Sequence, residues 1–366
     1  MSVYIHSIAT GNPPYKYAQT QVREFVKEQL PAESIAKRIT HRVYTSSGID
    51  TRYSAIPDLF EQHKGESFFR KNDEQKLQTP DTKFRNDWYI TYSKPLFTEV
   101  CRKALSESEF SAKDVTHLIT VSCTGFFAPG PDYFIVRELG LNVSVQRFHI
   151  GFMGCYAAFP AMRLAKAICE SQANAVVLIA DLELCSIHLQ FKEDADSIIS
   201  GSVFADGAAG MVLSAQKPKI GFEILALDTS LTDTGEQDMA WTIGNSGFDM
   251  TLSAYVPRII EAELGNLINP FLKNHTLLKE NIEIWAVHPG GKAILQKTEQ
   301  ALQIESEKLR CSYSILQEYG NMSSATILFI LQKILEDKSI QNSTFPAMAF
   351  GPGLTIEFGL MKKISS

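Results

Sequence analysis

Short apolar runs recur along the chain in a way that suits the strands of a buried sheet. HLITVSC at 117–123 and AVVLIADLEL at 175–184 are nearly continuous in hydrophobic residues, as strands buried on both faces are. VYIHSIA at 3–9 alternates more and is closed by the turn-forming sequence GNPPY. The same reasoning predicts further strands within 207–215, 282–291 and 345–363.

Between these runs, apolar residues return at helical spacing. The predicted helices cover 133–139, 156–171, 255–273, 291–303 and 322–336. Strands that alternate with helices over most of a chain are typical of α/β proteins, whose central sheet is covered on both faces. The pattern therefore predicts an α/β fold with a buried central sheet.

One long segment breaks this pattern. Residues 60–97 are polar and charged with scattered aromatic side chains, as in FFRKNDEQKLQTPDTKFRNDWY. We interpret the segment as a surface excursion or lid and not as a linker between separate folds, because loops run over protein surfaces and often carry function.

Two glycine-led turns open helices far apart in the chain. GCYAAFPAMRLAKAI places Cys155 directly after a glycine, and GNMSSATILFILQKIL does the same with Asn321. This correspondence indicates a duplicated architecture in which two buried helix N-termini meet at a centre.

Length, charge and the N-terminal sequence narrow the class of protein. The 366 residues carry a formal net charge of −6, which argues against a nucleic-acid partner because such a partner needs a basic face. The start, MSVYIHSIATGNPPY, lacks the basic and long apolar regions of a signal peptide. No apolar run approaches the roughly 18 residues of a membrane span. We therefore expect a cytoplasmic protein with no membrane span.

Among six cysteines, none of them in a CxxC pair, Cys155 has the most informative surroundings. The next charged residue after it is Arg163, and at a helix N-terminus the macrodipole favours a thiolate. Cys155 is either a buried structural thiol, the common use of cysteine, or a nucleophile with room for a ligand beside the small residues that follow. As a nucleophile it should react with iodoacetamide before the other five thiols.

His288 and Asn321 could act with such a thiol. His288 ends a predicted strand before Pro-Gly-Gly, and strand ends line the crevice of α/β folds. Each residue also has an ordinary interpretation, a hydrogen-bonded histidine at a strand end and a helix N-cap. Together, a thiolate, a histidine and an amide supply the nucleophile, its partner and the oxyanion donors that thioester chemistry needs. A metal site is not indicated, since His288 has no second ligand at suitable spacing, and no G-x-S-x-G motif indicates a serine hydrolase.

Several motifs in order resemble the type III polyketide synthases, the chalcone synthase-like enzymes of the thiolase superfamily. They are IHSIATGNPP, PGPDYFIVRELGL, GCYAAFPAMRLAKAI, FADGAAG, WAVHPGGKAIL, EYGNMSSATILFIL and FGPGLTIE, and they cover nearly the whole chain. The resemblance implies a thiolase-like five-layered αβαβα fold built from two related halves, which we place at 1–217 and 218–366. It also implies a homodimer that uses coenzyme A thioesters as substrates and needs no cofactor.

The resemblance gives roles to single residues. Cys155 matches the nucleophile that carries the acyl starter as a thioester. His288 and Asn321 match the pair that holds the malonyl thioester carbonyl and stabilises the enolate formed on decarboxylation. Loss of carbon dioxide then drives a Claisen-type attack on the acyl-cysteine. The implied reaction adds malonyl-CoA units to a starter and gives a pyrone, resorcinol or phloroglucinol-type product.

Further residues match positions around the family's cavity. Phe204 matches a gatekeeper phenylalanine, and Ser323 follows Asn321 in the YGNMSS motif. The turn that shapes the cavity wall matches Gly351, Pro352 and Gly353.

Other cavity positions depart from the family. Met250 stands where a second gatekeeper phenylalanine is usual, and Trp241 stands at a wall position often held by glycine. Threonine positions are held by His188, Cys185 and Cys123. Because these changes add bulk, Trp241 most of all, we predict a small cavity with few extensions or a short starter, unless a tunnel opens in another direction.

The basic rim expected for coenzyme A is thin. Only Arg42 matches a basic position of the family, and Ser46 stands where lysine is common. Substitutes could come from Lys37, Arg38 and Arg52. An acyl carrier protein therefore remains an alternative to coenzyme A as the acyl donor.

Two other functions are compatible with the same residues. A β-ketoacyl-carrier-protein synthase III would perform one condensation with a similar Cys, His and Asn set, although GPGLTIE and YGNMSS fit it less well. A non-catalytic acyl-binding protein could keep the fold, although the intact set of Cys155, His288 and Asn321 argues against this.

Overall fold

A nine-stranded hydrogen-bonded sheet runs through the computed structural model, which describes residues 1–59, 66–71 and 77–365. Its strand order is β11-β12-β13-β8-β1-β7-β6-β4-β5. The first half supplies β1 (Tyr4–Gly11), β4 (His117–Ser122), β5 (Gln146–Gly151), β6 (Val176–Leu184) and β7 (Asp206–Ser214). The second half supplies β8 (Gly221–Leu231), β11 (Ala286–Val287), β12 (Thr344–Gly351) and β13 (Thr355–Ile364).

The two halves repeat one succession of strand directions. In the first, β1 and β7 pair antiparallel, β7 and β6 antiparallel, and β6 and β4 parallel. In the second, β8 and β13 pair antiparallel, β13 and β12 antiparallel, and β12 and β11 parallel. The halves join where Tyr4 and Ile5 of β1 face Glu223 and Phe222 of β8. This repetition is the two-half architecture that the sequence predicts.

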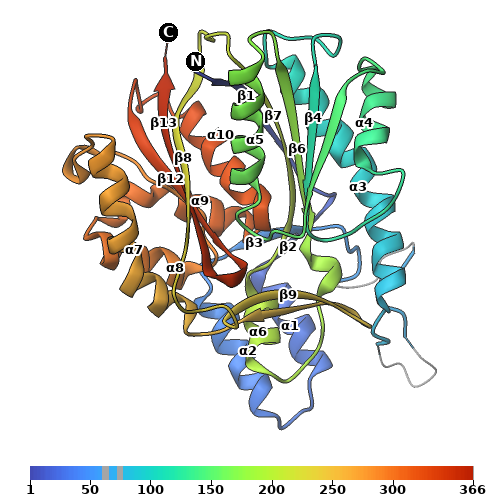
Figure 1. Cartoon of the computed structure of the whole chain (residues 1–366). Coiled ribbons are helices and arrows are strands. Elements are labelled where there is room, and N and C mark those ends of the chain that lie inside the picture. Colours follow the sequence, from blue (N-terminus) through green and yellow to red (C-terminus); the bar gives the residue numbers. More distant parts are fainter. Residues whose placement is uncertain (60–65, 72–76, 366) are drawn as a thin grey trace.

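Helices complete five layers, as Figure 1 shows. Helices α5 (Ala158–Ser171) and α10 (Thr326–Glu336) lie in the centre, between the strands of the two halves. The outer face of the first half carries α3 (Thr82–Ser106) and α4 (Pro131–Leu139), and that of the second carries α7 (Val256–Asn274) and α8 (Lys292–Leu302). The arrangement is the predicted αβαβα fold.

The apolar strand runs follow from burial between layers. In β6, Val177 and Ile179 join the core around the central helices, whereas Leu178 and Ala180 join the core beneath α3. Alternate residues therefore enter different cores, and both sets must be hydrophobic. A third core lies between β12, β13 and the outer helices α7 and α8.

The polar segment at 60–97 is corrected in part. From Thr82 onward it is the long helix α3, which buries Trp88, Tyr89 and Phe97 against the sheet and leaves Lys83 and Asp87 exposed. The charged residues are thus the solvent side of an amphipathic helix, and the prediction of a surface excursion is wrong for residues 82–97. Residues 60–65 and 72–76 of the segment lie outside the described residues.

Two other boundaries differ from prediction. The strand within 282–291 is only β11, Ala286–Val287, and the helix expected from 322 begins at Thr326 after a short turn, η4 (Ser323–Ala325). The irregular backbone after β11 and in η4 lies at the cavity described below, which His288 and Ser323 line.

Smaller elements close the lower side of the molecule in Figure 1. A hairpin of β9 (Met239–Gly244) and β10 (Gly247–Leu252) lies across α2 (Ile35–Ser46) and α6 (Ala195–Val203). The remaining elements include α1 (Gln19–Gln29), β2 (Tyr15–Ala18), β3 (Thr51–Ser54), η1 (Cys185–His188) and α9 (Arg310–Tyr319). None of the helices in the described residues has the length and apolarity to cross a membrane.

Candidate active site

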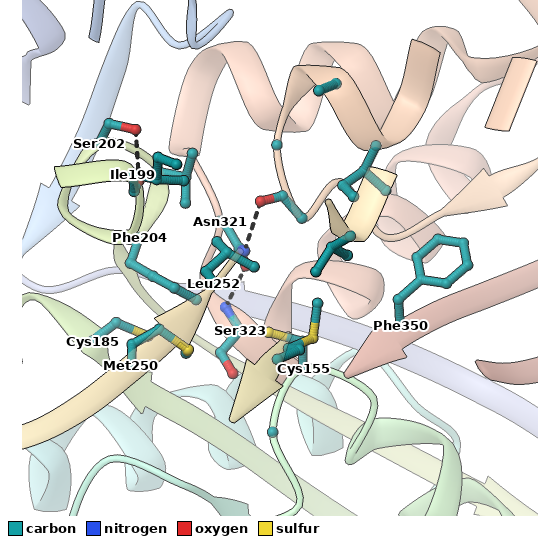
Figure 2. Close-up of a pocket in the computed structure, with 18 of the residues that line it drawn as sticks. Cys155, Cys185, Ile199, Ser202, Phe204, Met250, Leu252, Asn321, Ser323 and Phe350 are labelled. Atoms are coloured by element: carbon teal, nitrogen blue, oxygen red, sulfur yellow. Dashed lines mark hydrogen bonds between the residues drawn. The ribbon is translucent and has the colours of Figure 1, made fainter. Parts of the chain in front are cut away.

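Three side chains from distant parts of the chain line one cavity of about 270 Å³. Cys155 lies in the turn between β5 and α5, His288 follows β11, and Asn321 precedes η4 and α10. Figure 2 shows Cys155, Asn321 and Ser323 around this space, with apolar neighbours such as Phe350 and Leu252. The structure thus brings together the three residues that the sequence singles out.

The turn that carries Cys155 requires a glycine before it. Gly154 has a φ of +80°, and a Cβ there would lie 2.3 Å from the Pro352 side chain of the opposite half. Only glycine adopts this conformation without strain and also allows the contact. The Pro352 side chain therefore packs closely against Gly154 and holds the turn that carries Cys155 at the cavity, where Cys155 is 7% exposed.

His288 is held by its backbone while its ring is left without a partner. Its N–H donates to the Met348 carbonyl at 2.9 Å, which continues the pairing of β11 with β12. The ring is 1% exposed, and neither Nδ1 nor Nε2 has a hydrogen-bond partner among the described residues. Burial lowers the pKa of His288 to about 3, so the imidazole is neutral at ordinary pH. Buried polar atoms are rarely unpaired, so this ring is free to meet a ligand.

Asn321 is clamped by main-chain bonds on both sides. Its N–H donates to the Val203 carbonyl and its carbonyl accepts from the Ala205 N–H, each at 2.8 Å. The side-chain Oδ1 accepts from the Ser323 N–H at 2.9 Å, and Nδ2 reaches the Gly290 carbonyl at 3.4 Å. Ala325 is the N-cap of α10, so the simple N-cap interpretation of Asn321 is not what the structure has.

The thiol of Cys155 does not gain an acid pKa from the helix. Helix α5 begins at Ala158, beyond Cys155, and burial raises the pKa of the Cys155 thiol to about 12. The Ser323 and Asn321 side chains oppose this shift, while the charge of Glu183 adds to it. The sequence-based expectation of a lowered pKa overlooked desolvation, which outweighs the dipole in so dry a site.

One wall separates this cavity from a second, of about 290 Å³. Both cavities are lined by Phe204, Met250, Trp241 and Cys185. Trp241 is fixed by an Nε1–H bond to the Cys123 carbonyl at 2.9 Å, and the Cys123 sulfur accepts from the Gly154 N–H at 3.0 Å. The Met250 thioether makes no such hydrogen bond among the described residues, and its side chain can adopt several conformations.

Some residues expected at the cavity lie behind its wall. His188 lines only the second cavity, where Nε2 meets the Thr124 carbonyl at 2.8 Å and the ring stacks on Phe248 at 4.1 Å. Pro352 lines the first cavity, whereas Gly351 and Gly353 do not. Gly351 makes room for the Tyr156 ring, and Gly353 turns the chain with a φ of +69°. These glycines shape the turn and leave the contact to Pro352.

Comparison with known proteins identifies the family. The model of the chalcone and stilbene synthases matches residues 5–217 with its N-terminal domain and residues 224–365 with its C-terminal domain. The chain belongs to this family. It is a type III polyketide synthase, an acyl-transferring condensing enzyme with the thiolase-like fold that the sequence predicts.

Individual relatives agree over almost the full length. The alpha-pyrone synthesis polyketide synthase-like protein Pks18 of Mycobacterium tuberculosis is 29% identical, over 96% of this chain and 89% of its own. The 1,3,6,8-tetrahydroxynaphthalene synthase of Streptomyces peucetius subsp. caesius is 28% identical, over 98% and 92%. The crystal structure of PKS-I from the brown alga Ectocarpus siliculosus superposes with a TM-score of 0.92 at 31% identity, covering 100% of this chain and 99% of that one.

The mouth of this polyketide synthase site differs from the expected basic rim. Arg42 is exposed on α2 but does not line the cavity, whereas Val43 and Ser46 of the same helix do. Arg52 is buried, with Nη1 donating to the Gly201 and Phe204 carbonyls, so it is not a substitute for a rim cation.

Sequence reasoning missed a rim cation and a buried acidic pair. Lys292, exposed at the first turn of α8, lines the cavity mouth and rests its stem on Gly48. Asp181 and Glu183 are fully buried on β6, behind Cys123. The sequence does contain a signal for the acidic pair. Two carboxylates interrupt the apolar run AVVLIADLEL, and because they are two residues apart in a strand they share a face. In the part of the chain that the structure describes, no three His, Cys, Asp or Glu side chains gather as metal ligands.

Proposed function

We propose that this polyketide synthase carries its acyl starter on Cys155 and extends it with malonyl units at a site formed by His288 and Asn321. One observation carries the proposal: His288, fully enclosed and with both ring nitrogens unpartnered, shares the cavity of Cys155 and Asn321. A buried imidazole kept without a partner is costly to the fold, and a reacting thioester would supply the missing contact.

The first step is transfer of a proton from Cys155 to His288. Burial opposes ionisation of each group alone, because it raises the pKa of the thiol and lowers that of the imidazole. Formed together, thiolate and imidazolium attract each other strongly in the same low-dielectric space. The thiolate then attacks the starter thioester carbonyl, and the leaving coenzyme A thiolate takes the proton back from His288.

The second step is decarboxylation of a malonyl thioester. The Asn321 amide and the His288 ring can both donate to the thioester oxygen, which gains negative charge as carbon dioxide leaves. The 3.4 Å bond from Nδ2 to the Gly290 carbonyl engages one amide hydrogen weakly and leaves the other for this oxygen. The enolate carbon then attacks the acyl-cysteine carbonyl, and the Cys155 thiolate departs from the extended chain.

We propose coenzyme A as the donor, bound at the rim by Lys292 and Arg42. Lys292 lines the cavity mouth, and Arg42 is exposed on α2 one residue before the lining residue Val43. Two cations suit a phosphate-bearing donor but are fewer than a broad basic rim would provide. An acyl carrier protein is the alternative donor, and exchange of the carrier in one assay separates the two.

The cavity favours few extensions or a short starter, with a pyrone, resorcinol or phloroglucinol-type product. At about 270 Å³, it lies near the lower limit of small-molecule sites, and Trp241 occupies one of its walls. The relatives that make an alpha-pyrone or a tetrahydroxynaphthalene support an aromatic or pyrone product. The second cavity behind Met250 is where a longer chain would extend.

We infer a division into halves at 1–217 and 218–366, and a homodimer. The repeated strand directions support the division. The dimer is supported by β5, an exposed edge strand carrying Phe148 beside the exposed Tyr133 and Val143. Unpaired edges of this kind are protected when a second copy covers them. Light scattering coupled to size exclusion tests this, and a monomeric mass would overturn it.

The function is tested by supplying labelled malonyl-CoA with a panel of acyl-CoA starters. We expect carbon dioxide release, an acyl adduct on Cys155 by intact-protein mass spectrometry and products of at least two extensions. A single condensation with every starter would instead support the synthase III reaction. No carbon dioxide and no adduct with any starter would leave only acyl binding.

A further inference from the structure

Two carboxyl groups lie at the centre of the molecule, directly behind the cavity. Asp181 and Glu183 share the face of β6 that meets the central helices, and both are fully buried. The Ser324 hydroxyl lies between them, with its oxygen 2.7 Å from Asp181 Oδ1 and 2.7 Å from Glu183 Oε1. Acidic residues are almost never buried in this way without a specific arrangement of protons.

The protons of this group can be counted. A serine hydroxyl has one proton, so it can donate to one of the two carboxyl oxygens but not to both. The other oxygen can stand 2.7 Å from Ser324 Oγ only if it carries a proton and donates to the serine. One of the two carboxyl groups is therefore a neutral acid.

The surrounding donors decide which group is charged. Glu183 accepts from the Cys123 N–H at 3.0 Å and from Thr124 Oγ1 at 2.8 Å. The Thr124 oxygen itself accepts from the Leu184 N–H, so its proton is directed at Glu183. Asp181 Oδ2, by contrast, has no partner among the described residues. A buried anion needs donors, and only Glu183 has them.

Cys123 connects this charge to the site. Its N–H donates to Glu183, its carbonyl accepts from Trp241 of the cavity wall, and its sulfur accepts from Gly154 of the nucleophile turn. Glu183 thus fixes a residue that contacts both Trp241 of the wall and Gly154 of the turn that carries Cys155.

We propose that the acid proton lies on Asp181, which donates to Ser324 while Ser324 donates to the Glu183 carboxylate, and that Glu183 is a positioning residue for condensation. It holds Cys123 and thereby sets the Cys155 turn and the Trp241 wall. The proposal rests on the proposed role of Cys155, but the location of the proton is testable without any catalytic assay.

The charge on Glu183 also acts on its titratable neighbours. These are Asp181 on β6, Tyr89 on α3, and the thiols of Cys123, Cys155 and Cys185, whose pKa values it raises. Burial is the largest cause of the raised pKa of Cys155, and the Glu183 charge adds to it, so Cys155 is a neutral thiol until His288 accepts its proton.

The first test compares two isosteric substitutions in the full chain. In Asp181→Asn the amide replaces the acid proton as donor to Ser324, so turnover should fall by less than about threefold. In Glu183→Gln an amide NH₂ group meets the donors of Cys123 and Thr124, and we expect a loss of roughly tenfold or more in kcat. The opposite ranking, or equal effects of the two changes, would overturn the proposal.

Alkylation of Cys155 separates charge from general loosening. Glu183→Gln removes a negative charge, so the curve of iodoacetamide rate against pH should move to lower pH with an unchanged limiting rate at high pH, whereas loosening would also raise that limiting rate. Glu357→Gln is the matched control, because Glu357 is also a buried glutamate but is paired with Arg163. An unmoved curve in Glu183→Gln, or an equal movement in the control, would contradict a charge on Glu183.

The proton itself is visible by infrared spectroscopy, which serves even if Glu183→Gln fails to fold. Wild-type enzyme in heavy water should show the carbonyl band of a buried protonated acid, and Asp181→Asn should lack it. Retention of the band in Asp181→Asn would place the proton on another group and end the proposal. Loss of the band with unchanged condensation by a folded Glu183→Gln would keep the proton but remove the positioning role.

Discussion

The two halves of this enzyme place different residues at the same point of a repeated topology. Cys123 follows the parallel strand β4 in the first half, and His288 follows the parallel strand β11 in the second. Cys123 is bonded through its N–H, its carbonyl and its sulfur, whereas the His288 ring has no partner in the described structure. The residue after β4 is therefore fixed by three hydrogen bonds, whereas the residue after β11 has a side chain without a partner, as its proposed role toward substrate requires.

The largest effect should come from replacing His288, the residue that follows β11. His288→Gln deprives Cys155 of its proton acceptor and the enolate of a donor, so condensation should fall about 100- to 1,000-fold. Product formation from malonyl-CoA and an acyl-CoA measures it. His275→Gln, at the end of α7, is the control and should keep full activity. A loss under about threefold in His288→Gln would remove this histidine from the mechanism.

The buried neutral imidazole also predicts a pH dependence of stability. The pKa of His288 is about 3 in the folded chain and about 6.5 when unfolded, so below pH 6.5 the unfolded state binds the proton first. Stability is present above pH 6.5 and is lost as pH falls toward 3. At pH 5 the loss from this residue is about 2 kcal/mol.

Urea unfolding of wild type and His288→Gln at pH 7.5 and pH 5 checks this. The variant should lose less stability than the wild type between the two values. Equal losses would show that His288 is already protonated, or already solvated, in the folded protein.

Substitution of Cys123, the residue that follows β4, should have an effect of intermediate size on stability and turnover. Cys123→Ala leaves the Gly154 N–H buried without an acceptor, which costs about 1–3 kcal/mol of unfolding free energy. Cys123→Ser restores an acceptor of similar size and should recover part of that loss. If alanine and serine have the same stability and the same turnover, the sulfur contact does not hold the turn.

Substitution of Trp241 in the cavity wall should have the smallest effect on rate. The chain length of the product is the more sensitive measure of this change. Trp241→Phe keeps most of the ring but loses the bond to the Cys123 carbonyl, so it should cost about 1 kcal/mol or less and preserve chain length. Trp241→Gly should join the two cavities and lengthen the polyketide, as mass spectrometry of products would show. Unchanged chain length in Trp241→Gly would mean that another residue closes the wall.

The sequence predicts the layers of the fold well because the hydrophobic pattern of the buried strands is easy to recognise. Strands such as β4 and β6 are apolar on both faces, and no other common environment requires that. Helix α3 was missed because its charged outer face hides the buried Trp88 and Phe97 when residues are read one after another. The sequence marks the three cavity residues by neighbouring glycines, which precede Cys155 and Asn321 and follow His288, because such turns tolerate few other residues.

Other features could not be predicted from the sequence. The position of His188 behind the wall depends on its bonds to Thr124 and Phe248, which are distant in the chain. The raised pKa of Cys155 depends on how dry the cavity is, and that is a property of packing. Lys292 reaches the rim only because α8 begins beside Gly48.

The contact between Gly154 and Pro352 has a consequence for attempts to recombine this enzyme. The loop bearing Cys155 takes its shape from a proline ring supplied by the other half of the polypeptide. A chimera that joins the N-terminal portion of one homologue to the C-terminal portion of another would therefore be expected to fold around its separate cores and still misplace its sulfur. Shuffling experiments should exchange the two segments together, as one inherited unit.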